Sequence, residues 1–166
     1  MYRISTLNSM SQNDFVATLG WIFEESPWVA QRAWNKRPFT DLKTLHQSMV
    51  NVVREASDVE QITLICKHPD LATKTKMTDS SVKEQAGVGL DRLTPEEYRE
   101  FNTLNQAYKS KFNFPFIVAV RNHTKASILA AFTQRLENTK EAEFQTVLAE
   151  IEKIARFRLQ EVVESE

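Results

Sequence analysis

The sequence predicts an all-α fold, a compact helical bundle that residues 1–166 form as a single domain. Apolar residues recur three or four positions apart along most of the chain, which is the spacing of one face of a helix. Glycine is scarce, at only 3 residues in 166, whereas sheet-rich folds generally need more glycine at their tight turns. The length suits one ordinary domain, and no internal repeat, low-complexity tract or linker divides the chain.

Four helices are predicted in the first part of the chain. Each is preceded by a side chain that can accept a hydrogen bond from a backbone N–H of the first helical turn. These predicted capping residues are Ser11, Ser26, Thr40 and Ser57. The Ser26-Pro27 pair combines a cap with a proline at the first helical position. Glu60 adds the spacing of a capping box to the fourth helix. This helix should end near His68, because Pro69 disfavours helical geometry in the residue before it.

The second part begins with a predicted loop over residues 70–78 and a short helix from about Ser81. Three longer helices follow, with Thr94, Thr124 and Thr139 as their predicted capping residues. Asn113 can end the first of these three in a left-handed conformation. Residues 114–120 then form a continuous apolar run that contains Pro115. We interpret this run as a buried extended segment or the end of a short helix.

Composition and charge exclude several classes of function. A formal net charge of −1 offers no basic surface for a phosphate backbone, so no nucleic-acid partner is expected. No apolar run reaches the length of a membrane span, and the first residues lack the apolar core of a signal peptide.

The single cysteine, Cys66, excludes an internal disulfide and is expected to be a buried, inert thiol. Residues 164–166 are no peroxisomal signal, so we expect a cytoplasmic location.

Phosphate loops and metal motifs are absent from the sequence. Gly87 and Gly89 do not follow a strand-like run, which disfavours a nucleotide-binding loop. Cys66 and His68 have no second Cys/His pair to complete a tetrahedral site, and no His-Glu-x-x-His motif is present. We therefore expect no metal site.

Among the three histidines, His68 is the candidate for chemistry. His46 lies at the edge of an apolar helix face, which favours a half-buried structural role. His123 lies in a polar turn, which favours exposure to solvent. His68 follows a helix end, where the helix dipole favours the imidazolium form. A histidine held in such an irregular position is a candidate acid or base.

Helical phase separates two arginines near the end of the chain. At about 100° per residue, Arg158 falls on the apolar stripe with Ile151 and Ala155, so it should point inward. Arg156 points away and stands four residues after Glu152, the spacing of an exposed ion pair. A buried guanidinium needs an anionic partner. That partner is either a protein carboxylate in a structural salt bridge or a substrate carboxylate held by two parallel hydrogen bonds.

Two further polar residues have two interpretations each. Ser81 and Glu84 have capping-box spacing, so Glu84 either satisfies the backbone of a helix start or faces a ligand. The small residues that follow Glu84 would let another helix or a ligand approach closely. Asn105 is an amide on an aromatic helix stripe, where it either contacts a ligand or satisfies a buried backbone group.

Several segments, in order, resemble the 2-oxo-4-hydroxy-4-carboxy-5-ureidoimidazoline (OHCU) decarboxylase family, the third enzyme of the route from urate to allantoin. The segments are residues 22–30, 37–39, 68–72, 81–85 with 89–90, 101–108, 111–117 and 154–159. They cover nearly the whole chain. Several motifs in the right order are far more specific than any one of them.

The resemblance implies a helical bundle that decarboxylates OHCU to (S)-allantoin and CO₂ with no cofactor. The implied catalytic residues are His68, Glu84 and Arg158. Arg158 would orient the substrate carboxylate, His68 would take the hydroxyl proton, and Glu84 would hold His68 or the ureido group. The predicted substrate-binding residues are Pro69, Ser81, Gln85, Asn105, Phe116 and Ile117, with the 115–117 segment acting through its backbone.

The resemblance also implies a homodimer. Some bacterial members are fused to a urate oxidase domain, so the chain could be the N-terminal part of such a fusion. Two alternatives stay open. One is a non-enzymatic helical interaction domain in which His68 and Arg158 are structural. The other is a hydrolase of a cyclic ureide that uses the same pocket.

Overall fold

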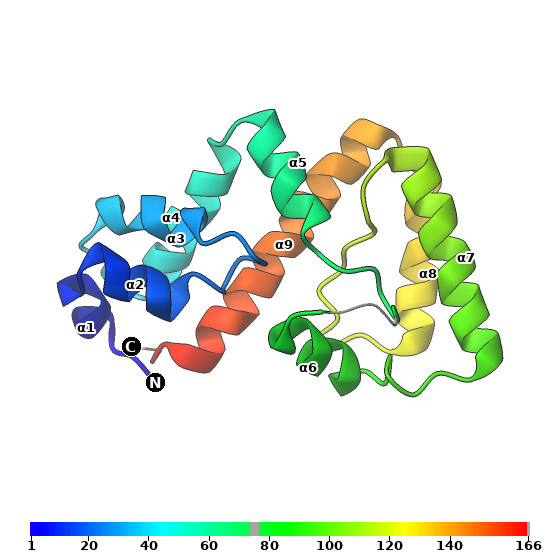
Figure 1. The fold of residues 1–166 in the computed structure, drawn as a ribbon, viewed down its shortest axis with the longest axis horizontal. Helices are drawn as coiled ribbons and strands as arrows, with labels where there is room; N and C mark the ends of the chain where they lie inside the picture. Colours follow the sequence, from blue (N-terminus) through cyan, green and yellow to red (C-terminus); the bar gives the residue numbers. More distant parts are fainter. Residues whose placement is uncertain (74–76, 166) are drawn as a thin grey trace. The chain divides into compact units, whose positions relative to one another are not determined.

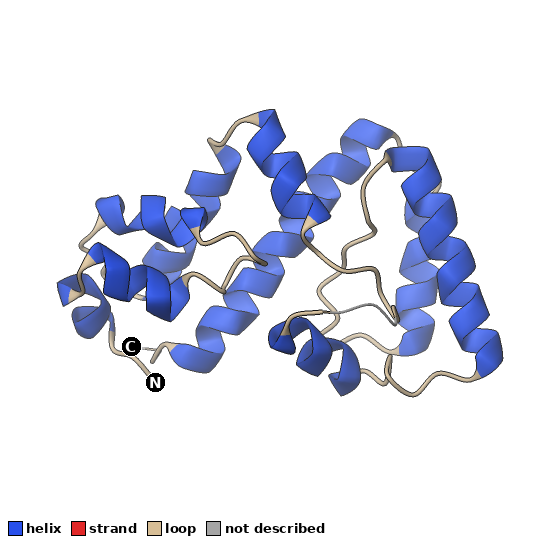
Figure 2. Ribbon diagram, in the orientation of Figure 1, coloured by secondary structure: helices blue, strands red, loops and turns tan. Residues whose placement is uncertain are grey.

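The computed structural model describes residues 1–73 and 77–165, and this part of the chain contains helices but no strand (Figure 1, Figure 2). The elements are α1 Ile4–Ser9, α2 Gln12–Leu19, α3 Trp28–Ala33, the 3₁₀-helix η1 Trp34–Lys36, α4 Leu42–Arg54, α5 Asp58–Cys66, α6 Asp79–Gly87, α7 Pro95–Phe112, α8 Lys125–Arg135 and α9 Lys140–Val162. The predicted all-α fold class is confirmed. None of the helices described has the length and apolar character needed to cross a membrane.

Most predicted helix starts are confirmed by hydrogen bonds from the first turn to the expected side chain. These capping residues are Ser11, Ser57, Thr94, Thr124 and Thr139. Ser57 with Glu60 and Thr94 with Glu97 form complete capping boxes. Asn113 ends α7 with φ 62°, in the predicted left-handed conformation. These signals succeed because a cap depends only on residues within one turn of the helix start.

Three predicted starts were wrong by one or two residues. Thr40 does not cap α4, because Asp41 accepts the backbone N–H of Thr44 at 2.7 Å. The carboxylate is the better acceptor, and the hydrogen bonds from Thr44 hold the pKa of Asp41 below its usual value. Ser26 does not cap α3, since its hydroxyl donates instead to the carbonyl of Glu24 at 2.8 Å. The start predicted near Ser81 moves two residues earlier, to Asp79.

The helices pack as two units, Met1–Lys67 with Glu152–Glu166, and His68–Ile151. In the first unit α3 packs against α2 and α4 over an apolar core that includes Leu7, Phe15 and Leu45. The two ends of the chain also meet there, as Tyr2 N–H donates to the Val162 carbonyl at 2.7 Å and Glu164 N–H donates to Tyr2 (Figure 1).

In the second unit α7 and α8 lie side by side (Figure 1) around a core of aromatic rings. The buried rings of this core are Tyr108, Phe112, Phe114, Phe116 and Phe132. Residues 114–120 are buried throughout, as predicted, but have neither helical nor strand structure. Helix α9 contributes its first half to this unit and its second half to the other.

Candidate functional site

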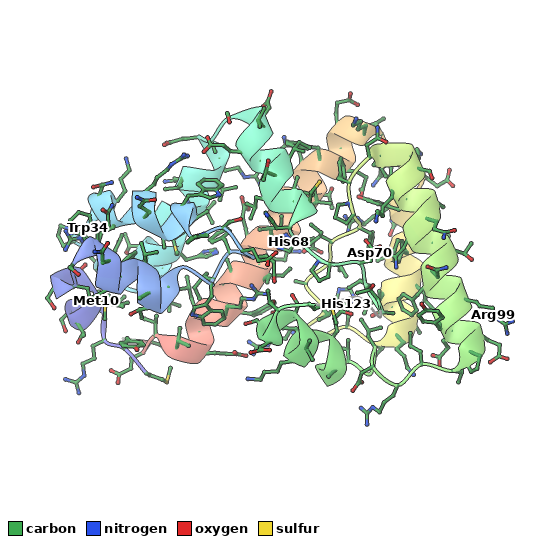
Figure 3. The ribbon with its side chains drawn as sticks, viewed as in Figure 1. Met10, Trp34, His68, Asp70, Arg99 and His123 are labelled. Atoms are coloured by element: carbon green, nitrogen blue, oxygen red, sulfur yellow. The ribbon has the colours of Figure 1, made fainter. Side chains whose placement is uncertain are left out.

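His68 lies two residues beyond the end of α5, at the start of an irregular loop that also carries Asp70 (Figure 3). Only 8% of His68 is exposed. The loop runs into the residues 74–76 that lie outside the described part of the chain; the described residues 70–73 and 77–78 are non-helical, as predicted. Its backbone is bent at Ala72, a buried residue with φ 57° in the left-handed region. Such a conformation persists only where surrounding contacts hold it.

Two side-chain amides from different helices hold consecutive residues of this loop. Asn105 of α7 donates from Nδ2 to the carbonyl of Leu71 at 2.9 Å. Gln85 of α6 accepts the backbone N–H of Ala72 at its Oε1, also at 2.9 Å. Lys109, one turn after Asn105, adds an ion pair to Asp70 at 3.2 Å. The loop that follows His68 is therefore held by three side chains, of which Asn105 and Gln85 were predicted to bind substrate.

These contacts settle one function of each amide. Asn105 satisfies a buried backbone group, which was one of its two interpretations. Its Oδ1 is nevertheless buried and has no hydrogen-bond partner among the described residues. In Gln85 the contact with Ala72 fixes the orientation of the amide, so Nε2 faces the other way, where it meets the sulfur of Met77 at 3.3 Å.

Helix α6 places three of the predicted site residues on neighbouring turns. Thr78, not Ser81, caps this helix, since its hydroxyl accepts the N–H of Ser81 at 3.3 Å. Glu84 is therefore in the middle of α6, and its interpretation as a capping residue was wrong. Ser81, Glu84 and Gln85 stand at positions i, i+3 and i+4, which share one side of a helix. Ser81 and Gln85 are buried and Glu84 is half-buried.

Phe116 and Ile117 lie in the buried 114–120 segment, against α8. The ring of Phe116 stacks on Phe132 with centroids 3.7 Å apart. Arg135 lies on the same helix as Phe132. Its guanidinium carbon lies 4.2 Å from the centroid of the Phe116 ring. Arg135 Nη1 also donates to the carbonyl of Ile117 at 2.7 Å. The segment is thus fixed by ring packing and by a cation.

Sequence reasoning missed the residue that holds Arg135, which is Glu143 at the start of α9. Glu143 is fully buried and accepts from Arg135 Nε at 2.8 Å, from the hydroxyl of Tyr108, and from Asn138 Nδ2 at 2.9 Å. Burial, together with donation to Glu143, raises the pKa of Tyr108 well above its usual value, so the hydroxyl stays a donor. Helical phase could have found Glu143, because it shares a face with Val147 and Ile151.

Arg158 belongs to the other unit, in the second half of α9. It is 3% exposed, whereas Arg156 is exposed, so the predicted phase is confirmed. Its Nη2 pairs at 2.8 Å with Glu24, which is 1% exposed, and Nη1 lies 3.3 Å from the Trp21 carbonyl. The structure thus supplies the protein carboxylate that was one of the two expected partners. The exposed pair expected for Arg156 is not found: Glu152 pairs with Arg54 of α4.

The remaining candidates have structural explanations. His46 is half-buried, as expected, and its Nε2 lies 2.8 Å from the Glu152 carbonyl. Nδ1 of His123 lies 2.9 Å from the Ser127 hydroxyl. Cys66 is exposed, so the expectation of a buried thiol was wrong. Within residues 1–73 and 77–165, no three His, Cys, Asp or Glu side chains gather as a metal site would require.

A family profile described as OHCU decarboxylase matches residues 8–160. The chain belongs to this family. One relative is the 2-oxo-4-hydroxy-4-carboxy-5-ureidoimidazoline decarboxylase of Halalkalicoccus jeotgali. It is 45% identical over 96% of this chain and 90% of the relative. The uric acid degradation bifunctional protein of Bacillus sp. (strain TB-90) is 47% identical over 98% of this chain, which spans only 32% of that protein.

Solved structures agree with the fold. A crystal structure of (S)-allantoin synthase matches with a TM-score of 0.80 and 32% identity, over 98% of this chain and 54% of the other. A crystal structure of OHCU decarboxylase in the presence of (S)-allantoin matches with a TM-score of 0.70, over 92% of this chain and 98% of the other. At 18% identity the second likeness shows the fold alone.

Proposed function

We propose that this member of the OHCU decarboxylase family releases CO₂ from OHCU and yields (S)-allantoin, a step of urate degradation. The observation that carries the proposal is the family match over residues 8–160, joined to relatives named for this reaction at 40–45% identity over nearly the whole chain. The buried polar face of α6 and the held loop after His68 support it, because they bring Ser81, Gln85 and the His68 loop into one unit.

The proposed reaction needs no metal or organic cofactor, because the substrate accepts its own electrons. In OHCU the carboxylate and a hydroxyl share one ring carbon, next to a C=N bond. The bond to the carboxylate breaks, CO₂ leaves, and the electron pair moves into the C=N system. The nitrogen of that C=N bond takes up a proton from solvent, the hydroxyl loses its proton to become a carbonyl, and the carbon that carries the ureido group gains a proton. Delivery of that proton to a single face gives the (S) product.

We assign the roles in this reaction to three side chains. Arg158 binds the substrate carboxylate, with Glu24 setting its orientation by the pair at 2.8 Å. His68 takes the hydroxyl proton, a contribution of roughly 10²–10⁴-fold for a positioned acid or base. Glu84, at the centre of α6, holds His68 or the ureido group. Nε2 of Gln85, Oδ1 of Asn105 and the backbone of Phe116 and Ile117 add polar contacts to the substrate, beside Pro69 and Ser81.

The test is a turnover assay with freshly prepared OHCU. CO₂ is measured directly, and the chirality of the product is followed by circular dichroism. Release of CO₂ with a growing (S)-allantoin signal supports the proposal. Ring opening without CO₂ would instead indicate a hydrolase of a cyclic ureide, and no turnover of either kind would favour a non-enzymatic interaction domain. Addition of EDTA should leave the rate unchanged, and a rate that needs added metal would contradict the cofactor-free mechanism.

Two substitutions test the acid and base assignments in the same assay. His68→Asn should reduce kcat by about 10²-fold or more with an unchanged melting temperature. Glu84→Gln should also lose activity at unchanged stability, because α6 is capped by Thr78 and not by Glu84. Near-native rates in either variant would remove that residue from the chemistry.

Homodimer formation, a cytoplasmic location and linkage to a urate oxidase domain remain predictions. The relative in Bacillus sp. (strain TB-90), named as a uric acid degradation bifunctional protein and matched over 32% of its length, supports the last of these. Light scattering at micromolar concentration tests the first, and a monomer there would contradict it.

A further inference from the structure

The 114–120 segment is buried but forms no helix or strand, so its peptide groups cannot satisfy one another in a regular pattern. Within the described part of the chain, its carbonyls at Ile117 and Val120 each accept a hydrogen bond, from Arg135 and from the N–H of His123. The same part of the chain supplies no acceptor to the peptide N–H groups of Phe116, Ile117 or Val118. Buried donors of this kind are costly unless a water molecule or a ligand pairs with them.

The Ile117 carbonyl accepts a hydrogen bond from a buried and charged donor. Its donor, Arg135, is 8% exposed and is itself bound at Nε by the fully buried Glu143. Glu143 is in turn fixed by Tyr108 and Asn138, from α7 and from the turn before α9. The Arg135 guanidinium also covers the ring of Phe116. A chain of charge-assisted hydrogen bonds therefore connects three helices to one peptide group.

We infer that Arg135, held by Glu143, is a positioning residue that fixes the peptide between Ile117 and Val118 for substrate binding. The inference rests on the proposed function. This peptide is trans, so its C=O and N–H point to opposite sides of the chain. With the Ile117 carbonyl bound to Arg135, the N–H of Val118 faces away from the buried pair. It is then a fixed donor for a carbonyl or carboxylate oxygen of the substrate.

A purely structural ion pair would be a weak explanation for this arrangement. Buried ion pairs can often be replaced by well-packed apolar side chains without loss of stability. The surroundings of Arg135 are already rich in aromatic rings, and its Nη2 stays buried without a partner among the described residues. What an apolar side chain could not do here is bind the Ile117 carbonyl.

The experiment compares Arg135→Lys with Arg54→Lys, which alters an arginine–glutamate pair of the other unit. Lysine keeps the charge but cannot bind Glu143 and the Ile117 carbonyl together as the planar fork does. Three quantities are measured: the Kd for allantoin by calorimetry, kcat and KM with fresh OHCU, and hydrogen–deuterium exchange of the peptide that covers 114–120. The protein is the full chain in every case.

Arg135→Lys should raise the Kd for allantoin and the KM on the order of 10- to 100-fold, with a smaller change in kcat. Exchange should become faster in 114–120 and stay native elsewhere, and Arg54→Lys should change none of the three. Native affinity, KM and exchange in a folded Arg135→Lys protein would overturn the positioning role while leaving the proposed function intact. If the wild-type protein neither binds allantoin nor converts OHCU, the proposed function itself fails, and this inference with it.

If Arg135→Lys does not fold, Tyr108→Phe takes its place, because it removes only the hydroxyl that holds Glu143 and keeps the ring. It should shift the Kd for allantoin and the exchange of 114–120 in the same direction by a smaller factor. Native values for both in Tyr108→Phe would then overturn the inference.

Discussion

Each unit of the molecule buries an arginine–glutamate pair, and the two pairs differ in the length of the contacts that the arginine makes with backbone carbonyls. Arg135 binds Glu143 at 2.8 Å and a carbonyl at 2.7 Å, and Glu143 receives two further donors. Arg158 binds Glu24 at 2.8 Å, but its two carbonyl contacts are long, at 3.3 and 3.4 Å. Long contacts are weak and easily exchanged for a better acceptor. The comparison separates an arginine that orders the protein from one that we assign to the substrate.

The largest expected effect is on stability, in the pair that orders the protein. Glu143→Gln should lower the free energy of unfolding by about 3–5 kcal/mol, because it leaves Arg135 buried without its counter-charge. The new amide NH₂ is itself a donor and would face groups that donate hydrogen bonds to Glu143 in the wild type. Denaturant unfolding measures the loss. Glu141→Gln, exposed on the same helix, is the control and should stay within about 0.5 kcal/mol. A loss of that small size for Glu143→Gln would mean that the buried pair does not order this unit.

The second largest expected effect is on catalysis, in the pair formed by Arg158 and Glu24. Arg158→Lys keeps the charge but loses the planar fork, so kcat/KM per folded molecule should fall on the order of 10²- to 10³-fold, the usual loss when one preorganised donor is removed. Arg156→Lys, two residues away and exposed, is the matched control and should stay within about 0.5 kcal/mol in stability with little loss of activity. Native activity in a folded Arg158→Lys protein would make Arg158 a structural partner of Glu24 and remove the contrast between the pairs.

The smallest effect concerns the hydroxyl that anchors Glu143. Tyr108→Phe should cost about 1.5–3 kcal/mol at neutral pH, the contribution of a hydrogen bond to a charged group. Because burial raises the pKa of Tyr108 in the folded state, its contribution is complete below the unfolded value near 10 and is lost as pH rises beyond it. Stability measured from about pH 9 to 11 should therefore fall less steeply in Tyr108→Phe than in the wild type. Equal slopes would show that the Tyr108 proton is not held by folding.

Helical phase predicts that both arginines are buried, but it does not predict their partners. The argument that placed Arg158 inward applies equally to Arg135, which lies three residues after Phe132 and seven after Ile128, both fully buried. The signal for a buried cation was therefore present in the sequence at Arg135 as well. Phase alone predicts that a cation is buried and says nothing about its partner.

What the sequence by itself determined is local: the helical class, five of the capping residues, the end of α5 before His68, the left-handed Asn113 and the inward face of Arg158. Each depends on residues within about one turn or on the period of one helix. Only the tertiary structure decided that Glu24 pairs with Arg158, since 134 residues separate them and no helix contains Glu24. It likewise decided that Gln85 and Asn105 hold the His68 loop and that Arg135 holds residues 114–120. Those contacts join groups whose proximity exists only after the helices have packed, and no spacing along the chain encodes it.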